Sequence, residues 1–245
     1  MNMRFGPLFC IALALLACRT PAQSGKAAPT PGDSTYTYKT RSADGIGKYY
    51  MGREIAYYMS HRAADWLDRP EREAEERPSL LLASLDLRPT DVVADIGAGS
   101  GYYSLRIAPI LPQGKVLATD IQPEMLDIIR RKQAEEQITN IETILSTETD
   151  PMLPPGSVDM VLMVDVYHEL AYPRELMQAV VRALKPGGRV LLVEFRAEDK
   201  KVPIKELHKM SEAQARREME AAGLIFRENK TILPWQHCLV FEKGA

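Results

Sequence analysis

The amino-acid sequence predicts an α/β fold: a Rossmann-like, doubly wound and mostly parallel sheet that is closed by an antiparallel strand. Three observations lead to this prediction. Short apolar runs alternate with segments of helical periodicity. A glycine-rich turn follows the first run of the main domain and opens a helix. The last two apolar runs can pair as antiparallel strands.

Each strand is expected at a short apolar run and each helix at an amphipathic segment. The strands are expected at residues 91–96, 115–120, 141–146, 158–165, 189–195, 224–229 and 237–243. The helices are expected at residues 52–67, 78–87, from the glycine turn to about 110, 122–137, 173–184 and 211–222. The run 158–165 is apolar on both faces, which is typical of a strand in the middle of a parallel sheet. Ser211 suits the N-cap of the last helix.

Charge and cysteine content exclude several classes of function. The formal net charge is −2 over 245 residues, which gives no electrostatic reason to expect nucleic acid or an anionic membrane surface as a partner. The three cysteines are Cys10, Cys18 and Cys238, too few and too scattered for a disulfide framework or a cysteine metal cluster. No metal site is therefore predicted. The sequence does not indicate an oligomeric state.

The first 18 residues resemble an export signal. Residues 5–17 are uncharged and follow a lone Arg4, and they are too short to span a bilayer comfortably. The run that ends at Cys18 resembles a bacterial lipobox, which implies lipidation of this cysteine and anchoring to the membrane of the cell envelope. Two alternatives stay open: a plain cleaved signal, or a start codon placed upstream of a cytoplasmic enzyme.

Three further regions follow along the chain. Residues 19–45 are rich in Pro, Ser, Thr, Gly and Ala and are expected to form a disordered tether. Residues 46–77 are expected to form an N-terminal helical cap, because apolar side chains recur at helical spacing within 52–67. Residues 78–243 make up the main α/β domain.

The glycine turn has the chemistry of a cofactor loop. Gly97, Gly99 and Gly101 allow a sharp turn and a close approach of the backbone to a ligand, but they lack the third glycine of the dinucleotide fingerprint. Asp95 at the strand end opposes a pyrophosphate and suits a cationic ligand. Asp120 ends the next strand, where a carboxylate can accept hydrogen bonds from both ribose hydroxyls. This combination describes S-adenosylmethionine better than a nicotinamide dinucleotide.

Four motifs then resemble those of the class I S-adenosylmethionine-dependent methyltransferases. They are VADIGAGSG, VLATDIQPEML, LPPGSVDMVLMVDVYHEL and LKPGGRVLLVEF, and the resemblance covers about residues 78–243. It implies a methyltransferase domain with S-adenosylmethionine as cofactor. By motif position it assigns the following contacts: Asp95, Gly97, Gly99 and Gly101 around the methionine part, Asp120 at the ribose, and Ile121 against the adenine.

Two residues are candidates for contact with the adenine amino group. The family places an acid shortly after the third strand, and here the segment is shorter than usual and offers Glu148 and Asp150. Asp150 is the residue we select.

The candidate catalytic residues follow the fourth strand. Methyl transfer mainly needs alignment of the acceptor, and a general base helps where the acceptor has a proton to lose. Asp165 either acts as this base or binds the amino group of the cofactor. His168 either acts as a base or caps the following helix, and Tyr167 is expected to orient the acceptor.

The sequence thus predicts methyl transfer to an unidentified small-molecule acceptor. It lacks the Asn/Asp-Pro-Pro-aromatic motif used on amino nitrogens, the cysteine pairs of arsenic chemistry and an obvious acidic metal set of the kind used on catechols. The alternative is a membrane-tethered, catalytically inactive binding protein that retains the fold. The intact glycine loop with its two acids favours the enzyme, whereas export favours the alternative, because the methyl donor is cytoplasmic.

Overall fold

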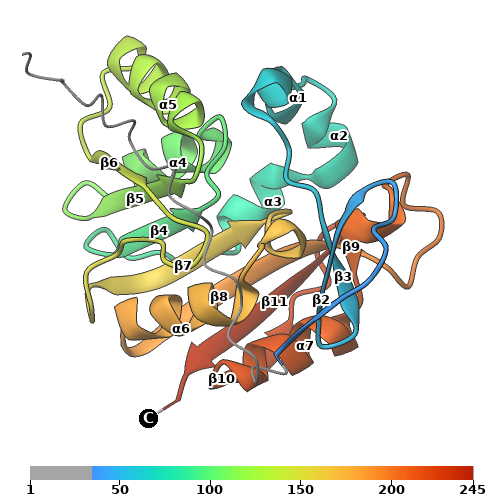
Figure 1. Cartoon of the computed structure of the whole chain (residues 1–245). Helices are drawn as coiled ribbons and strands as arrows, with labels where there is room; N and C mark the ends of the chain where they lie inside the picture. The colour runs from blue at the N-terminus through green and yellow to red at the C-terminus, as the bar shows by residue number, and fades with distance from the viewer. Residues whose placement is uncertain (1–34, 245) are drawn as a thin grey trace, which may run out of the picture. The chain divides into compact units, whose positions relative to one another are not determined.

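The computed structural model describes residues 35–244 (Figure 1). The predicted signal and Cys18, together with residues 19–34 of the predicted tether, lie outside this range. Within the range, no helix combines the length and the apolar character that a membrane crossing requires.

The main sheet confirms the predicted doubly wound architecture. Its strand order is β10-β11-β8-β7-β4-β5-β6, and β9 pairs with β8 beside this path. The pairs from β6 to β8 are parallel, whereas β11 pairs antiparallel with both β8 and β10. The strands are β4 (Val92–Ile96), β5 (Lys115–Asp120), β6 (Ile141–Leu145), β7 (Val158–Val164), β8 (Leu184–Arg196), β9 (Lys209–Met210), β10 (Leu224–Asn229) and β11 (Gln236–Lys243).

Helices cover both faces of this sheet (Figure 1). On one face the core includes side chains of α3, α4 and α5, and on the other it includes those of α6 and α7. Val93 and Ala94 are neighbours on β4 and belong to opposite cores, as the two-residue period of a strand requires. The helices are α3 (Pro78–Ala83), α4 (Tyr102–Ile107), α5 (Pro123–Glu135), α6 (Pro173–Ala183) and α7 (Glu212–Ala221), with 3-10 turns η2 (Ala108–Ile110), η3 (Tyr167–Glu169) and η4 (Glu206–His208).

Two local predictions are confirmed by the structure. The run 158–165 forms a central strand, since β7 lies between β4 and β8. The hydroxyl of Ser211 accepts a hydrogen bond of 3.1 Å from the backbone amide of Gln214, so Ser211 is the N-cap of α7.

The N-terminal cap differs from the prediction, because its first half is a sheet. The antiparallel strands β1 (Tyr36–Tyr38), β2 (Gly45–Tyr50) and β3 (Arg53–Ala56) replace the expected helix start. Met51 and Gly52 both have positive φ, 48° and 93°, which is the geometry of a tight hairpin turn.

This turn explains why the helix prediction was wrong for residues 52–56. It folds β3 back on β2 and pairs Tyr50 with Arg53. The helical spacing of apolar residues over 52–67 is therefore a coincidence in its first half. The tether prediction is also wrong at its end, because residues 36–38 form β1 and β2 begins at residue 45. Helical structure follows only in η1 (His61–Ala63), α1 (Ala64–Leu67) and α2 (Arg72–Glu76).

Candidate functional site

Three aspartates lie at the carboxyl ends of neighbouring parallel strands. Asp95 stands on β4, Asp120 ends β5 and Asp165 follows β7. In open α/β sheets this edge is where ligands bind. The structure therefore brings together three of the acids that the sequence singles out.

The glycine loop between β4 and α4 is tightly packed. Gly97 has a φ of 65°, and a Cβ on this residue would overlap Cγ2 of Val166. Gly99 has a φ of 55°, and its Cβ would lie 2.6 Å from Cδ1 of Leu67. Both positions require glycine for backbone conformation and for space. Val166 and Leu67 therefore pack closely against the glycine loop.

Asp95 is a buried acid with one neutral partner. Its Oδ2 accepts a hydrogen bond of 2.7 Å from the hydroxyl of Ser104. Burial, together with the nearby charge of Asp120, raises the pKa of Asp95 to about 6 against the opposing effects of the Ser104 hydrogen bond and Arg72. A cationic group placed here would offset the unfavourable burial of this charge.

Asp120 organises the loop and retains acceptor capacity. Its Oδ2 accepts from the Gly99 amide at 3.0 Å and its Oδ1 from the Gln122 amide at 2.9 Å. A carboxylate oxygen has two lone pairs, so each keeps one for a further donor such as a ribose hydroxyl. Burial raises the pKa of Asp120, and these backbone hydrogen bonds oppose the rise. Ile121, beside it, is 39% exposed and offers an apolar surface.

Asp150 is turned toward other partners. Its Oδ1 accepts a hydrogen bond of 2.7 Å from the Met152 amide, and its Oδ2 lies 3.8 Å from the guanidinium of Arg182 near the end of α6. Both oxygens therefore have neighbours within the chain. As at Asp120, each oxygen keeps a lone pair for a further donor, so the choice of Asp150 as the adenine ligand stays a prediction.

Asp165 and Gln236 form a pair in which one buried oxygen of each residue has no donor. Asp165 has a φ of 51°, an uncommon conformation for a residue with a side chain. Its Oδ2 accepts a hydrogen bond of 3.3 Å from the amide nitrogen of Gln236. Its Oδ1 and the Gln236 Oε1 are buried without a partner among residues 35–244. Buried acceptors left without donors are unfavourable, so this pair suits a ligand that donates hydrogen bonds.

The charges around Asp165 point to the same kind of ligand. Burial raises the pKa of Asp165 well above its usual range, and the charges of Glu76 and Glu194 raise it further. Arg72 opposes this rise. An ammonium group, or an acceptor with an O–H or N–H, would satisfy both the charge and the vacant hydrogen-bond positions.

Residues 57–77, here called the covering segment, cross over the glycine loop. The His61 amide donates to the side-chain oxygen of Gln122 at 2.9 Å, and the Gln122 side chain donates to the Met59 carbonyl at 2.9 Å. Asp68 accepts from the Ser100 hydroxyl at 3.1 Å. These contacts tie the segment to the loops after β4 and β5. The covering segment is thereby placed to exclude water from the carboxyl edge.

The covering segment contains a buried ion pair, Arg72 with Glu76, whose charges act on Asp95 and Asp165. Nε of Arg72 lies 2.8 Å from Oε2 of Glu76, and both side chains are almost fully buried. The guanidinium also stacks 4.4 Å from the ring centroid of Tyr102. Sequence reasoning missed Arg72, since an Arg–Glu pair four residues apart is a common feature of exposed helices.

Tyr167 is not placed to meet an acceptor. Its side chain is 0% exposed and packs in the core between the sheet and helices α6 and α7. The prediction that Tyr167 orients the acceptor is therefore not supported. Its ring packs among apolar side chains, and its buried hydroxyl has no hydrogen-bond partner among residues 35–244.

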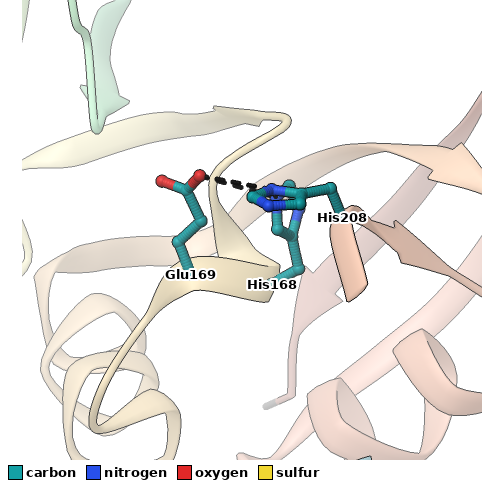
Figure 2. Close-up of side chains that lie close together, drawn as sticks. All are labelled: His168, Glu169 and His208. Carbon is teal, nitrogen blue, oxygen red and sulfur yellow. Dashed lines mark hydrogen bonds and ion pairs between the residues drawn. The ribbon is translucent and has the colours of Figure 1, made fainter. Parts of the chain in front are cut away.

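His168 belongs to a buried polar group. Its Nδ1 lies 2.6 Å from Oε2 of Glu194, and its Nε2 lies 3.0 Å from Nδ1 of His208. Figure 2 shows the side chains of His168, Glu169 and His208 converging. His168 does not cap α6 with its side chain, which contradicts that alternative.

Negative charge dominates the surroundings of His168. Burial alone would lower the pKa of His168, but the carboxylates of Glu194 and Glu169 outweigh burial and raise it. The group thus stabilises positive charge. Sequence reasoning missed Glu194 and His208. A lone acid in the apolar run LLVEF was the available signal for Glu194, whereas nothing in the segment KELHK distinguishes His208.

Part of the chain is similar to known methyltransferases. Residues 94–190 match a family model described as a methyltransferase domain. An uncharacterized methyltransferase-like protein of Schizosaccharomyces pombe is 33% identical over 114 residues, which cover 46% of this chain and 41% of that protein. The demethylmenaquinone methyltransferase of Symbiobacterium thermophilum is 31% identical over 115 residues, which cover 46% of each chain. The chain thus spans less than half the length of these curated relatives.

The fold is shared with solved structures. A SAM-dependent methyltransferase from Aquifex aeolicus superposes with a TM-score of 0.72 at 23% identity, covering 76% of this chain and 100% of that one. The fold and the matched domain together describe an α/β chain whose residues 94–190 resemble a methyltransferase domain. They support S-adenosylmethionine as its cofactor.

Proposed function

We propose that the protein transfers the methyl group of S-adenosylmethionine to a small-molecule acceptor bound near Asp165. The observation that carries this proposal is a group of three acids around a glycine loop at one sheet edge: the buried Asp95 and Asp120, and Asp165 with its buried Oδ1. The cofactor carries an ammonium and a sulfonium, which such acids stabilise. A relative named as a demethylmenaquinone methyltransferase supports a small molecule as the acceptor.

Different residues of the chain bind different parts of the cofactor. When bound, S-adenosylmethionine supplies an activated methyl group on its sulfonium. Asp95 neutralises the positive charge of the methionine part, and Asp120 accepts hydrogen bonds from the ribose. Ile121 offers its exposed side chain to the adenine. The covering segment excludes water and so favours transfer to the aligned acceptor.

Asp165 and Gln236 supply hydrogen-bond-accepting oxygens near the end of β7. Their two buried oxygens without partners accept hydrogen bonds from the amino group of the cofactor or from a protonated acceptor. In the second case Asp165 also takes the proton as a general base. Asp165→Asn separates these roles. A base predicts a lower kcat at unchanged cofactor affinity, and an amino-group ligand predicts weaker cofactor binding.

The test of the cofactor site is calorimetric titration of the full chain with S-adenosylhomocysteine. Micromolar affinity is expected for the wild type, with a loss of at least tenfold for Asp95→Ala. Transfer of a labelled methyl group from S-adenosylmethionine is then measured against a panel of small phenols, quinols and amines. A folded wild-type protein that binds no S-adenosylhomocysteine contradicts the proposal and leaves the inactive, membrane-tethered binding protein as the better hypothesis.

We also propose that lipidation of Cys18 anchors the protein in a bacterial cell envelope. The lipobox-like run before Cys18 supports this localisation. Metabolic labelling with an alkyne fatty acid is expected to mark the wild type and to leave Cys18→Ala unmarked. Equal absence of label in both, with the protein in the soluble fraction, would indicate an unprocessed leader and a cytoplasmic enzyme.

A further inference from the structure

Three side chains outside the cofactor residues have the composition of a metal centre. They are His168 and Glu169 from η3 and His208 from η4. Each offers one ligand atom, and these atoms lie within 4.8 Å of one another. Two imidazoles and one carboxylate form a ligand set that suits first-row transition metals rather than Mg²⁺ or Ca²⁺, which prefer oxygen.

The distances fit a single ion. Nε2 of His168 lies 3.0 Å from Nδ1 of His208, and Oε1 of Glu169 lies 3.8 Å and 3.5 Å from these two nitrogens. The point equidistant from the three atoms in their plane is about 2.0 Å from each, which is the ligand distance of Zn²⁺ to nitrogen and oxygen. The three side chains converge on this point from two separate turns (Figure 2).

A buried carboxylate orients the first histidine. Oε2 of Glu194 lies 2.6 Å from Nδ1 of His168, and both side chains are at most 2% exposed. Oε1 of Glu194 accepts from the Tyr167 amide at 2.8 Å, which fixes the carboxylate. Metal-ligating histidines usually donate their second ring nitrogen to such a carboxylate, which holds the other nitrogen toward the ion.

Glu169 is fixed in the same way. Its Oε2 accepts a hydrogen bond of 3.1 Å from the Met59 amide in the covering segment, and its Oε1 is left facing the imidazoles. Two carboxylates beside two imidazoles in a largely buried place create an excess of negative charge. A divalent cation offsets this excess.

We propose that His168, Glu169 and His208 bind one divalent transition-metal ion, best suited to Zn²⁺, with Glu194 as the carboxylate behind His168. Three protein ligands leave a coordination position open, which in zinc proteins is the mark of a site that binds water or a substrate rather than of a closed structural site. The side chain of His208 is 23% exposed, so this position has access to solvent. The proposal stands independently of methyl transfer.

The test is metal binding by the chelator-stripped full chain. Titration with Zn²⁺ is expected to give one ion per chain, and Co²⁺ is expected to give the visible spectrum of nitrogen and oxygen ligation. Because the chain also has cysteines outside the described range, an intense thiolate charge-transfer band would place the ion elsewhere and overturn the proposal. Circular dichroism establishes that each sample is folded.

Matched variants locate the site. His208→Ala removes a partly exposed ligand and leaves the buried His168–Glu194 pair in place, and Glu169→Gln removes the carboxylate charge. Each is expected to weaken Zn²⁺ binding at least tenfold. His61→Ala is the control, because His61 also lies beside a carboxylate, 3.8 Å from Glu124, outside the group. Its affinity for Zn²⁺ is expected to match the wild type.

Failure of the metal proposal can be distinguished from failure of the cofactor proposal. S-adenosylhomocysteine is titrated into the same stripped samples. A folded protein that binds S-adenosylhomocysteine but no Zn²⁺ or Co²⁺, or a His208→Ala variant with unchanged metal affinity and spectrum, overturns the metal site. Glu194, His168 and His208 then form a metal-free hydrogen-bonded chain with Glu169 beside it.

Discussion

The carboxylate of Asp120 accepts a hydrogen bond of 3.0 Å from the backbone amide of Gly99. The acid that ends β5 thereby fixes the loop that follows β4, its neighbour in the sheet. One side chain serves two purposes, because its remaining lone pairs face the place expected for the ribose. Any change at Asp120 must therefore be measured for both loop order and ligand binding.

Asp120→Ala is expected to weaken S-adenosylhomocysteine binding at least tenfold and to keep the fold. The loss combines the ribose hydrogen bonds with a less ordered Gly99 loop, and each charge-assisted hydrogen bond contributes about 1.5–3 kcal/mol. Calorimetry measures the affinity and circular dichroism the fold. Asp120→Asn retains one acceptor oxygen and is the milder control. Unchanged affinity in the alanine variant contradicts the ribose assignment.

Cofactor binding is expected to weaken as the pH falls below about 6, because the pKa of Asp95 is raised to about 6 by burial. Above that pH the carboxylate is charged and attracts the cationic part of the ligand. Protonation removes one charge, so the Kd rises by at most tenfold per pH unit below 6. In Asp95→Asn the affinity should be weaker at pH 7.5 and should depend less on pH between 7.5 and 5 than in the wild type. A wild-type profile that is equally flat would contradict this role.

The same acid is expected to lower the stability of the ligand-free protein. The folded-state pKa of Asp95 lies above its ordinary value of 3.8, so its contribution to stability is greatest below pH 3.8 and is lost as the pH rises through about 6. Asn carries no charge. Asp95→Asn should therefore raise the free energy of unfolding at pH 7.5 by about 1–3 kcal/mol, measured by urea denaturation without ligand.

Gly97→Ala is expected to destabilise the protein more than Gly156→Ala. The two glycines have similar positive φ, 65° and 60°, so both variants carry the cost of an unfavourable backbone conformation, about 1–2 kcal/mol. Only the Cβ at Gly97 meets Val166, whereas nothing lies within 4 Å at Gly156. The difference in urea midpoint between the two variants isolates the contact with Val166. Equal midpoints would mean that this side chain moves aside freely.

Arg53→Ala is expected to lower the free energy of unfolding by about 3–5 kcal/mol, because it leaves a buried carboxylate unpaired. Nε and Nη2 of Arg53 each donate to a different oxygen of Glu218 at 3.0 Å, and the Glu218 side chain is 0% exposed. Arg53→Met combined with Glu218→Gln removes both charges and should recover much of the loss. Urea denaturation measures the single and double variants. A single variant within 1 kcal/mol of the wild type would show that Glu218 finds another donor.

The parallel sheet was predictable from the sequence because its signals are local. The apolar runs of β4, β5 and β7 each stand between turn residues, and the sheet they build agrees with the local pattern. The hairpin of β2 and β3 was missed since its turn is set by two residues, Met51 and Gly52, inside a stretch of helical spacing.

The site was predictable only in part, for a related reason. Asp95 and Asp120 follow strands in a fixed pattern, so their meeting at one edge follows from the fold. Glu194 and His208 reach His168 from positions 26 and 40 residues away, through a long β8 and an irregular loop. Such a long-range contact leaves no periodic pattern in the amino-acid sequence. Gln236 is likewise brought to Asp165 by the antiparallel pairing of β11 with β8.

The pairing of Arg53 with Glu218 also has a consequence for synthesis on the ribosome. The strands β1 to β3 emerge early, yet the acid that neutralises Arg53 lies in the last fifth of the chain. The backbone carbonyl that Arg53 holds, that of His168, is also made much later. The covering segment follows β3 directly, and its contacts with Ser100 and Gln122 involve residues that are made well before α7. Arg53, in contrast, can pair with Glu218 only after α7 has left the exit tunnel.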